Sequence, residues 1–175
     1  MTSKDFQPGT LLIAHPQLDD PSFGRSVILV LARGEDDGVI GANIAGPALK
    51  GRLFEGGPMQ APLPLLLHEV KEGVASSRPL GDSGYAITAL FPTEAGKFEP
   101  AGLIGKKLDK SMFFLGYAGW GAGQLENETQ MGAWTPSKLT LDELMQTPAA
   151  DRWTRAAADA GLIASVAPAV KPPTP

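Results

Sequence analysis

The chain has 175 residues, of which 43% are hydrophobic and 19% are charged, and its formal net charge is −4. This composition suits one domain with a real core and excludes an intrinsically disordered chain, which would have few apolar residues and a high net charge. The absence of cysteine excludes disulfides, thiolate metal sites and a cysteine nucleophile, and two histidines are too few for a histidine-rich metal site.

The first part of the chain is typical of strands joined by turns. Residues 9–15 are short and apolar, and residues 26–33 are β-branched and continuously apolar, which predicts a strand buried on both faces. Between them, Asp20 before Pro21 is typical of a helix start, here of a single turn. Residues 39–44 are expected to return as the hairpin partner of the second strand, across the turn sequence GEDDG.

The middle of the chain continues in the same way. Pro62 and Pro64 cannot donate ladder hydrogen bonds, so the strand that contains them should begin at an edge or outside the sheet. Residues 93–109 match no period, because glycine and proline interrupt any helical pattern. The further expected strands are residues 52–58, 62–70, 85–91 and 111–119.

Helices are expected late in the chain. Residues 124–131 form a short helix with acidic residues near its start, and residues 139–145 carry Thr140 and Glu143 at capping-box spacing. Thr147 is expected to cap a third helix that has Pro148 at its first position. The predicted buried face of that helix comprises Trp153, Ala156, Ala157 and Ala160, and Gly161 stops it.

The order of these elements predicts the fold class. Strands come first, helices come late, and hairpins replace regular βαβ repeats, which indicates an α+β fold with a mixed, mostly antiparallel sheet and a few flanking helices. We expect a flexible N-terminus at residues 1–8, a single domain at residues 9–163, and a disordered proline-rich tail at residues 164–175.

The acidic balance bears on partners and location. Nonspecific nucleic-acid binding needs lysine and arginine to neutralise phosphates, and the nearest approach to a basic cluster is Lys106, Lys107 and Lys110, which we interpret as a solvated face. The N-terminal sequence lacks the apolar stretch of a signal peptide, and the longest apolar run, residues 27–32, is too short for a bilayer. We therefore expect a cytoplasmic protein without membrane contact or direct nucleic-acid binding.

Three segments carry a family resemblance. They are LLIAHPQLDDPSFGRSVILVLARGEDDGVIGANIAGP at residues 11–47, FEGGPMQAPLPLLLHEV at residues 54–70, and LGYAGWGAGQLENETQMGAW at residues 115–134. Together they resemble the AlgH/YqgE family of bacterial proteins over roughly residues 9–161. The resemblance implies a compact mixed α/β protein without a DNA-binding motif, although members are often labelled transcriptional regulators. At residues 43–47 the chain lacks the arginine of the Asn-Arg-Pro sequence usual in relatives.

The third segment supplies the main candidate site. Its glycines let backbone N–H groups approach a ligand, and the start of the following helix favours anions. The alternative is a tight strand-to-helix connection in which the aromatic rings are buried. Without a lysine or a serine or threonine the loop is not a P-loop. The candidate ligand-binding residues here are Tyr117, Gly119, Trp120, Gly121, Gly123 and Gln124.

Three other side chains are candidates for binding or chemistry. His15 lies near Asp20 in the sequence, and a carboxylate-oriented histidine can serve as a general base. His68 ends the strand matched by the second segment, where it lines a cleft or caps the strand through a backbone carbonyl. Arg25 precedes the buried strand, where it forms an ion pair or clamps an anion.

Two functions from different classes remain open. The first is a non-enzymatic binding or regulatory protein that holds an unknown small ligand or protein partner on the glycine loop, with Arg25 and His68 as further candidates. The second is a hydrolase-like enzyme acting on a small molecule, with His68 or His15 joined by Asp20 and Arg25 in one pocket. No catalytic residue is assigned, and no cofactor or metal is expected.

Overall fold

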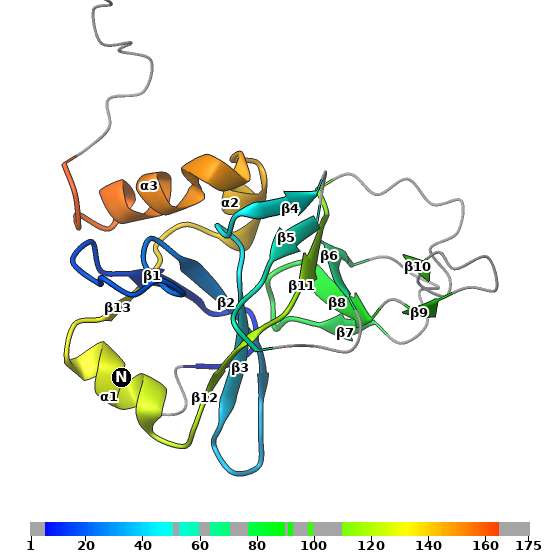
Figure 1. Ribbon diagram of the computed structural model, residues 1–175, viewed down its shortest axis with the longest axis horizontal. Helices are drawn as coiled ribbons and strands as arrows, with labels where there is room; N and C mark the ends of the chain where they lie inside the picture. The colour runs from blue at the N-terminus through cyan, green and yellow to red at the C-terminus, as the bar shows by residue number, and fades with distance from the viewer. Residues whose placement is uncertain are drawn as a thin grey trace, which may run out of the picture.

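The computed structural model describes residues 6–50, 53–59, 64–70, 77–89, 91–92, 98–99 and 110–164. Its main elements are a five-stranded and a six-stranded sheet that lie beside each other (Figure 1). In spatial order the first sheet contains β12 (Ala118–Trp120), β3 (Val39–Asn43), β2 (Val27–Arg33), β1 (Leu11–Ala14) and β13 (Trp134–Pro136). The second contains β4 (Ala48–Lys50), β5 (Leu53–Glu55), β11 (Met112–Leu115), β6 (Leu65–Glu69), β8 (Tyr85–Ala89) and β7 (Arg78–Pro79).

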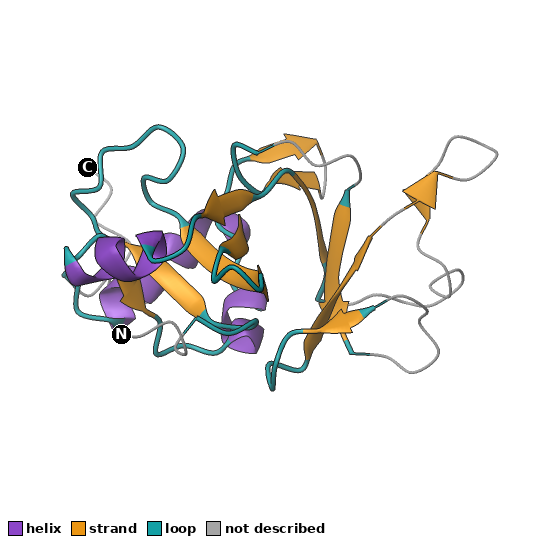
Figure 2. Ribbon diagram, turned by 90° about the horizontal axis from the view of Figure 1, so that it is seen from below, coloured by secondary structure: helices purple, strands orange, loops and turns teal. Residues whose placement is uncertain are grey.

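The described elements confirm the α+β class with mostly antiparallel strands. Among the described strand pairs only β5 and β11 run parallel. A separate hairpin is formed by β9 (Phe91–Pro92) and β10 (Phe98–Glu99). The described helices are α1 (Gln124–Gln130), α2 (Leu141–Met145) and α3 (Ala149–Asp159). Figure 2 shows them gathered at the five-stranded sheet, while the six-stranded sheet stands to one side.

One hydrophobic core joins both sheets. The first five residues of β2 are buried, as their apolar run predicts, and Leu67 of β6 and Phe114 of β11 belong to the same cluster. Phe6 is fully buried in this core, so the packed chain begins before residue 9. The predicted tail beyond residue 164 and most of residues 93–109 lie outside the described residues. No helix in the described part combines the length and the hydropathy needed to cross a bilayer.

The segment between β1 and β2 consists of turns rather than the predicted one-turn helix. Asp20 nevertheless acts as a cap, because its Oδ1 accepts hydrogen bonds from Ser22 N at 2.7 Å and Phe23 N at 3.1 Å. The carboxylate bonds Ser22 N, and it shares Phe23 N with Asp20 O, which lies 3.3 Å from that nitrogen. The turn then delivers Arg25, at φ +56°, to the start of β2.

The two C-terminal helices follow the predicted ranges but differ in one cap. Thr140 and Glu143 form both bonds of the capping box at α2. Thr147 does not cap α3: its hydroxyl donates back to Glu143 O at 3.0 Å, and Pro148 holds the N-cap position. Because Pro148 itself is the N-cap, α3 begins one residue later than predicted and Thr147 lies outside it, where its Oγ1 accepts from Arg155 Nη1. At the other end Gly161, at φ +75°, stops α3 as predicted.

The third helix fixes the five-stranded sheet to the rest of the core. Its predicted apolar face is buried at Trp153, Ala156 and Ala157, and Trp153 Nε1 donates to Ala14 O of β1 at 3.0 Å. A buried indole usually finds a hydrogen-bond partner for its N–H, and here that partner joins α3 to β1.

The chain passes between the two sheets at neighbouring points, and we call this boundary the seam. One passage follows β3, before β4, and the other lies between β11 and β12. Residues 111–119 were predicted as one strand, and this is wrong. Gly116, at φ +84°, breaks the segment, so that β11 pairs in one sheet and β12 in the other.

Candidate functional site

At the seam, two family-like segments meet backbone to backbone. A Cβ atom on Gly116 would lie 2.6 Å from Gly57 O, and one on Gly57 would lie 2.3 Å from the carbonyl carbon of Tyr117. Real Cβ atoms do not approach other atoms so closely, and both glycines have positive φ. The Gly-Gly-Pro turn and the Gly-Tyr-Ala-Gly strand therefore need glycine to pack together.

A small cavity of about 120 Å³ opens beside this junction, and we call it the seam cleft. Its walls come from the turn before β2, the end of β3 and the turn after β5. The lining residues are Pro21, Ser22, Asn43, Pro47, Glu55, Gly57 and Pro58.

Backbone hydrogen bonds fix the walls of the seam cleft. Asn43 N donates to Gly56 O at 2.9 Å, and Glu55 N donates to Pro47 O at 3.1 Å. Asn43 Oδ1 accepts from Val27 N at 3.2 Å and from Ala45 N at 2.9 Å. This asparagine therefore closes a local turn, as its place at a strand end suggests, and joins it to β2. The cleft is held open by structure that needs no ligand.

Several polar groups at the seam cleft are left for solvent or a ligand. Within the described residues, no hydrogen bond or ion pair reaches the Glu55 carboxylate, the Ser22 hydroxyl or Asn43 Nδ2. Glu55 and Ser22 are exposed, and Asn43 is 8% exposed. A rigid concavity with a few convergent polar groups is the usual form of a binding site.

The loop predicted to cradle a ligand packs largely against other residues of the protein. Trp120 is only 4% exposed, and its ring lies 5.8 Å from that of Phe23 and 5.9 Å from that of Trp134, between centroids. The indole thus packs in the core and leaves almost none of its surface for direct contact with a ligand. This corresponds to the tight-connection alternative for Trp120.

The other residues of that loop either form hydrogen bonds within the chain or lie apart from the seam cleft. Gln124 Oε1 accepts from Gly121 N at 3.1 Å, and Tyr117 N donates to Met59 O at 3.0 Å. Gly119 is exposed on the edge strand β12, with the half-buried ring of Tyr117 beside it. Gly123, at φ +76°, is the N-cap of α1 and has no side-chain cap.

His68 and Arg25 serve separate parts of the fold. His68 is fully buried, with Nδ1 2.6 Å from Glu69 O and Nε2 2.7 Å from Thr88 Oγ1. The Arg25 guanidinium lies 4.6 Å from the centroid of the Trp153 ring and bonds Thr154 Oγ1 at 3.4 Å. None of these contacts joins the two residues, so the structure does not assemble them into one pocket.

His15 likewise has a local role. Its Nδ1 accepts a hydrogen bond from Gln17 N at 3.1 Å, whereas the Asp20 carboxylate is bonded to the turn that follows it. Because the general-base pair of the hydrolase hypothesis needs a histidine bonded to its carboxylate, this geometry does not provide one. The described residues also contain no cluster of three acidic or histidine side chains suited to a metal ion.

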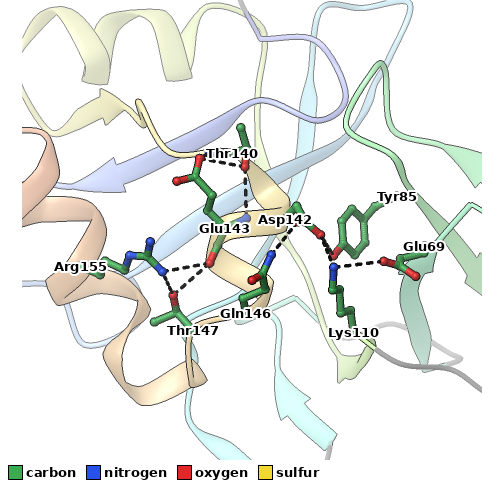
Figure 3. Close-up of polar contacts among 9 residues, drawn as sticks. All are labelled: Glu69, Tyr85, Lys110, Thr140, Asp142, Glu143, Gln146, Thr147 and Arg155. Carbon is green, nitrogen blue, oxygen red and sulfur yellow. Dashed lines mark hydrogen bonds and ion pairs between the residues drawn. The ribbon is translucent and has the colours of Figure 1, made fainter.

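A second polar region, the helix network, joins α2 to the six-stranded sheet (Figure 3). Asp142 accepts from Tyr85 Oη at 2.8 Å, Lys110 Nζ at 3.1 Å and Gln146 Nε2 at 2.7 Å. The bonds from Tyr85 and Lys110 lower the pKa of Asp142. Burial, together with the bond to Asp142, raises the pKa of Tyr85, so this hydroxyl is not primed to lose its proton.

Arg152 completes the helix network from α3. The guanidinium is buried and donates to Leu144 O at 2.8 Å, Thr147 O at 2.9 Å and Ile44 O at 2.8 Å. Burial lowers the pKa of Arg152 to about 10. All these acceptors are backbone carbonyls, so Arg152 connects α2, α3 and the end of β3 as a structural joint.

The seam cleft was not identified from the sequence, although the signal was present. Neither Asn43 nor Glu55 was among the candidate residues predicted from the sequence. All the lining residues fall within the first two family-like segments, residues 11–47 and 54–70. A comparison of which segments meet in space would have found them, but a single sequence does not supply that information.

Comparisons with known proteins agree with this architecture. A profile of the AlgH-like family matches residues 11–165. A UPF0301 protein of Thioalkalivibrio sulfidiphilus is 33% identical over 181 residues, covering 93% of this chain and 94% of the relative. One from Thermobifida fusca is 32% identical over 170 residues, covering 84% and 83%.

Solved structures share the fold. The solution structure of AlgH from Pseudomonas aeruginosa matches with a TM-score of 0.66 and 25% identity, covering 92% of each chain. The crystal structure of a protein from Corynebacterium diphtheriae also gives a TM-score of 0.66, at 21% identity, over 84% of this chain and 83% of that one.

Proposed function

The chain belongs to the AlgH-like family, and from that premise we propose that it is a non-enzymatic binding protein of regulatory type that holds its ligand or partner in the seam cleft. The observation that supports this most is the set of unbonded polar groups on Ser22, Asn43 and Glu55 around a cavity with fixed walls. Within the described residues these groups make no bond that holds the fold, so a ligand can use them without breaking one.

The residue chemistry favours binding over hydrolysis. A hydrolase of the type considered needs a base beside a nucleophile, and neither of the two histidines lines the seam cleft. A role in gene regulation, as family members are labelled, then acts through a protein partner or a small ligand. The net charge of −4 gives no support to direct contact with DNA phosphates.

A variant with a large side chain that blocks the seam cleft tests the proposal. Ser22→Trp places a large side chain at the exposed rim of the cleft, and Gln130→Trp places the same side chain on an exposed position of α1. Both variants and the parent chain are screened against a fragment library by thermal shift, because a ligand that binds only the folded state raises its melting temperature.

We expect fragments that stabilise the parent chain and Gln130→Trp but not Ser22→Trp. Isothermal titration calorimetry of the best fragment should show the same loss. Stabilisation that persists in Ser22→Trp, or a library without any hit, would count against the seam cleft as the binding site.

A further inference from the structure

The size of the seam cleft limits what can enter it. Pockets for drug-sized ligands have about 300–1,000 Å³, whereas this cavity has about 120 Å³. That volume suits the end of a single amino-acid side chain. The inference that follows rests on the proposed function and specifies the occupant of the same site.

The charge of the wall favours a cation. Glu55 is the only ionisable residue among those that line the seam cleft, and its carboxylate is exposed without an ion pair to any described residue. The lining contains no lysine or arginine to attract an anion. An unpaired carboxylate at a concave surface is complementary to a positive group.

The backbone of the wall also offers few donors for an anion. The N–H groups of Ser22, Asn43 and Glu55 already donate within the chain, at 2.7, 2.9 and 3.1 Å from their acceptors. Of the lining residues this leaves only the Gly57 amide without a described acceptor. Three others are prolines and have no N–H to donate: Pro21, Pro47 and Pro58.

The surroundings of the seam cleft suit a protein surface. Met59, which directly follows Pro58, is 49% exposed, and Leu115, the cross-strand partner of Glu55, is 39% exposed. Basic side chains lay their apolar stems along such surfaces while their charged ends reach a carboxylate. Arginine fits best, because its planar guanidinium can bond a carboxylate with two parallel hydrogen bonds.

We propose that the seam cleft binds an arginine side chain of a protein partner, with the Glu55 carboxylate as its counter-charge and Met59 and Leu115 flanking its stem. The three prolines have no N–H to donate, and the amides of Ser22, Asn43 and Glu55 already donate within the chain. The site therefore selects against anions. Neutral side chains of similar size lack the charge that Glu55 recognises.

The test uses N-acetyl-arginine N-methylamide and its neutral isostere N-acetyl-citrulline N-methylamide, titrated into the full chain while ¹H–¹⁵N spectra are recorded. The arginine probe should perturb the amide signals of Ser22, Asn43 and Gly57 and should bind about tenfold more tightly than the citrulline probe. In Glu55→Gln the arginine affinity should fall by a similar factor. Glu35→Gln, which changes an exposed glutamate in the β2–β3 turn, should leave it unchanged.

Three outcomes would overturn the inference: equal affinity for the two probes, unchanged arginine affinity in Glu55→Gln, or no arginine binding at the seam cleft. The proposed function can survive these results. If neutral or anionic fragments bind the parent chain and not Ser22→Trp, the seam cleft remains the binding site and only the choice of arginine is wrong.

Discussion

The seam cleft and the helix network are both rich in polar groups, but they use them differently. In the helix network, Asp142 accepts three side-chain hydrogen bonds and Arg152 donates to three backbone carbonyls. In the seam cleft, the Glu55 carboxylate and the Ser22 hydroxyl have no bond to a described residue. The first arrangement stabilises a joint between elements, and the second leaves polar groups that are able to bond a ligand.

This difference shows why a cluster of charged side chains is weak evidence for a functional site. The helix network shifts the pKa values of Tyr85, Lys110 and Asp142, which often marks an active site. Here each shift is explained by a hydrogen bond or burial that holds α2 against the six-stranded sheet. Structural ion-pair networks perturb pKa values in the same way.

The largest expected effect concerns the packing that shapes the seam. Gly116 and Gly132 both have φ +84°, but a Cβ on Gly116 would lie 2.6 Å from Gly57 O, whereas a Cβ on Gly132 meets nothing within 4 Å. Gly132→Ala should cost about 1–2 kcal/mol from the left-handed conformation alone. Gly116→Ala should cost about 1–3 kcal/mol more because of the clash. Urea unfolding of both variants measures the difference. Equal losses in the free energy of unfolding would show that the seam accommodates the added methyl group without cost.

The next effect concerns the helix network. Arg152→Met keeps an apolar stem but leaves the carbonyls of the buried residues Ile44 and Thr147 without a described donor, so the free energy of unfolding should fall by about 2–4 kcal/mol. Arg155→Met, an exposed position on the same helix, should cost less than about 1 kcal/mol. Thermal and urea unfolding check this pair. A loss in Arg152→Met as small as that in Arg155→Met would mean that the bonds of Arg152 add little to the free energy of unfolding.

A pH dependence should follow from Asp142. Its pKa is lowered in the folded state, so its contribution to stability is complete above its ordinary pKa and is lost as pH falls through the folded-state value. Asp142→Asn should therefore be less stable at neutral pH and should lose less stability than the parent chain below about pH 4. Asp159→Asn, exposed on α3, is the control and should follow the parent chain. If the free energies of unfolding of Asp142→Asn and the parent chain fell in parallel with pH, the pH dependence would not come from Asp142.

The smallest expected effect is at the seam cleft itself. Glu55 is exposed and makes no described ion pair, so Glu55→Gln should change the free energy of unfolding by less than about 0.5 kcal/mol. This near-neutral substitution is nevertheless the one expected to weaken ligand binding. A destabilisation as large as that of Arg152→Met would place Glu55 among the structural residues and remove the contrast between the two regions.

Much of the fold could be predicted from local sequence patterns. The continuous apolar run of β2, its hairpin partner β3, and the capping box at Thr140 and Glu143 are all determined within a few residues, and the structure confirms them. Gly161 could be assigned as a helix stop for the same reason. Such features depend on backbone periodicity and local hydrogen bonds, which a single sequence displays.

What could not be predicted depends on contacts between distant segments. The break at Gly116 exists because the Gly-Gly-Pro turn packs against it, and no window around residue 116 contains that turn. Trp120 in a glycine-rich loop was interpreted as a ligand contact, but its burial is decided by Phe23 and Trp134. The role proposed for Glu55 likewise depends on the cleft around it.

The most direct test of the seam cleft as the binding site is to map fragment binding on the ¹H–¹⁵N spectrum of the full chain. The account predicts that the perturbed amides cluster at Ser22, Asn43, Glu55 and Gly57, while the signals of α2 and α3 stay in place. Perturbations centred instead on the helix network, or on the loop at residues 119–123, would contradict it.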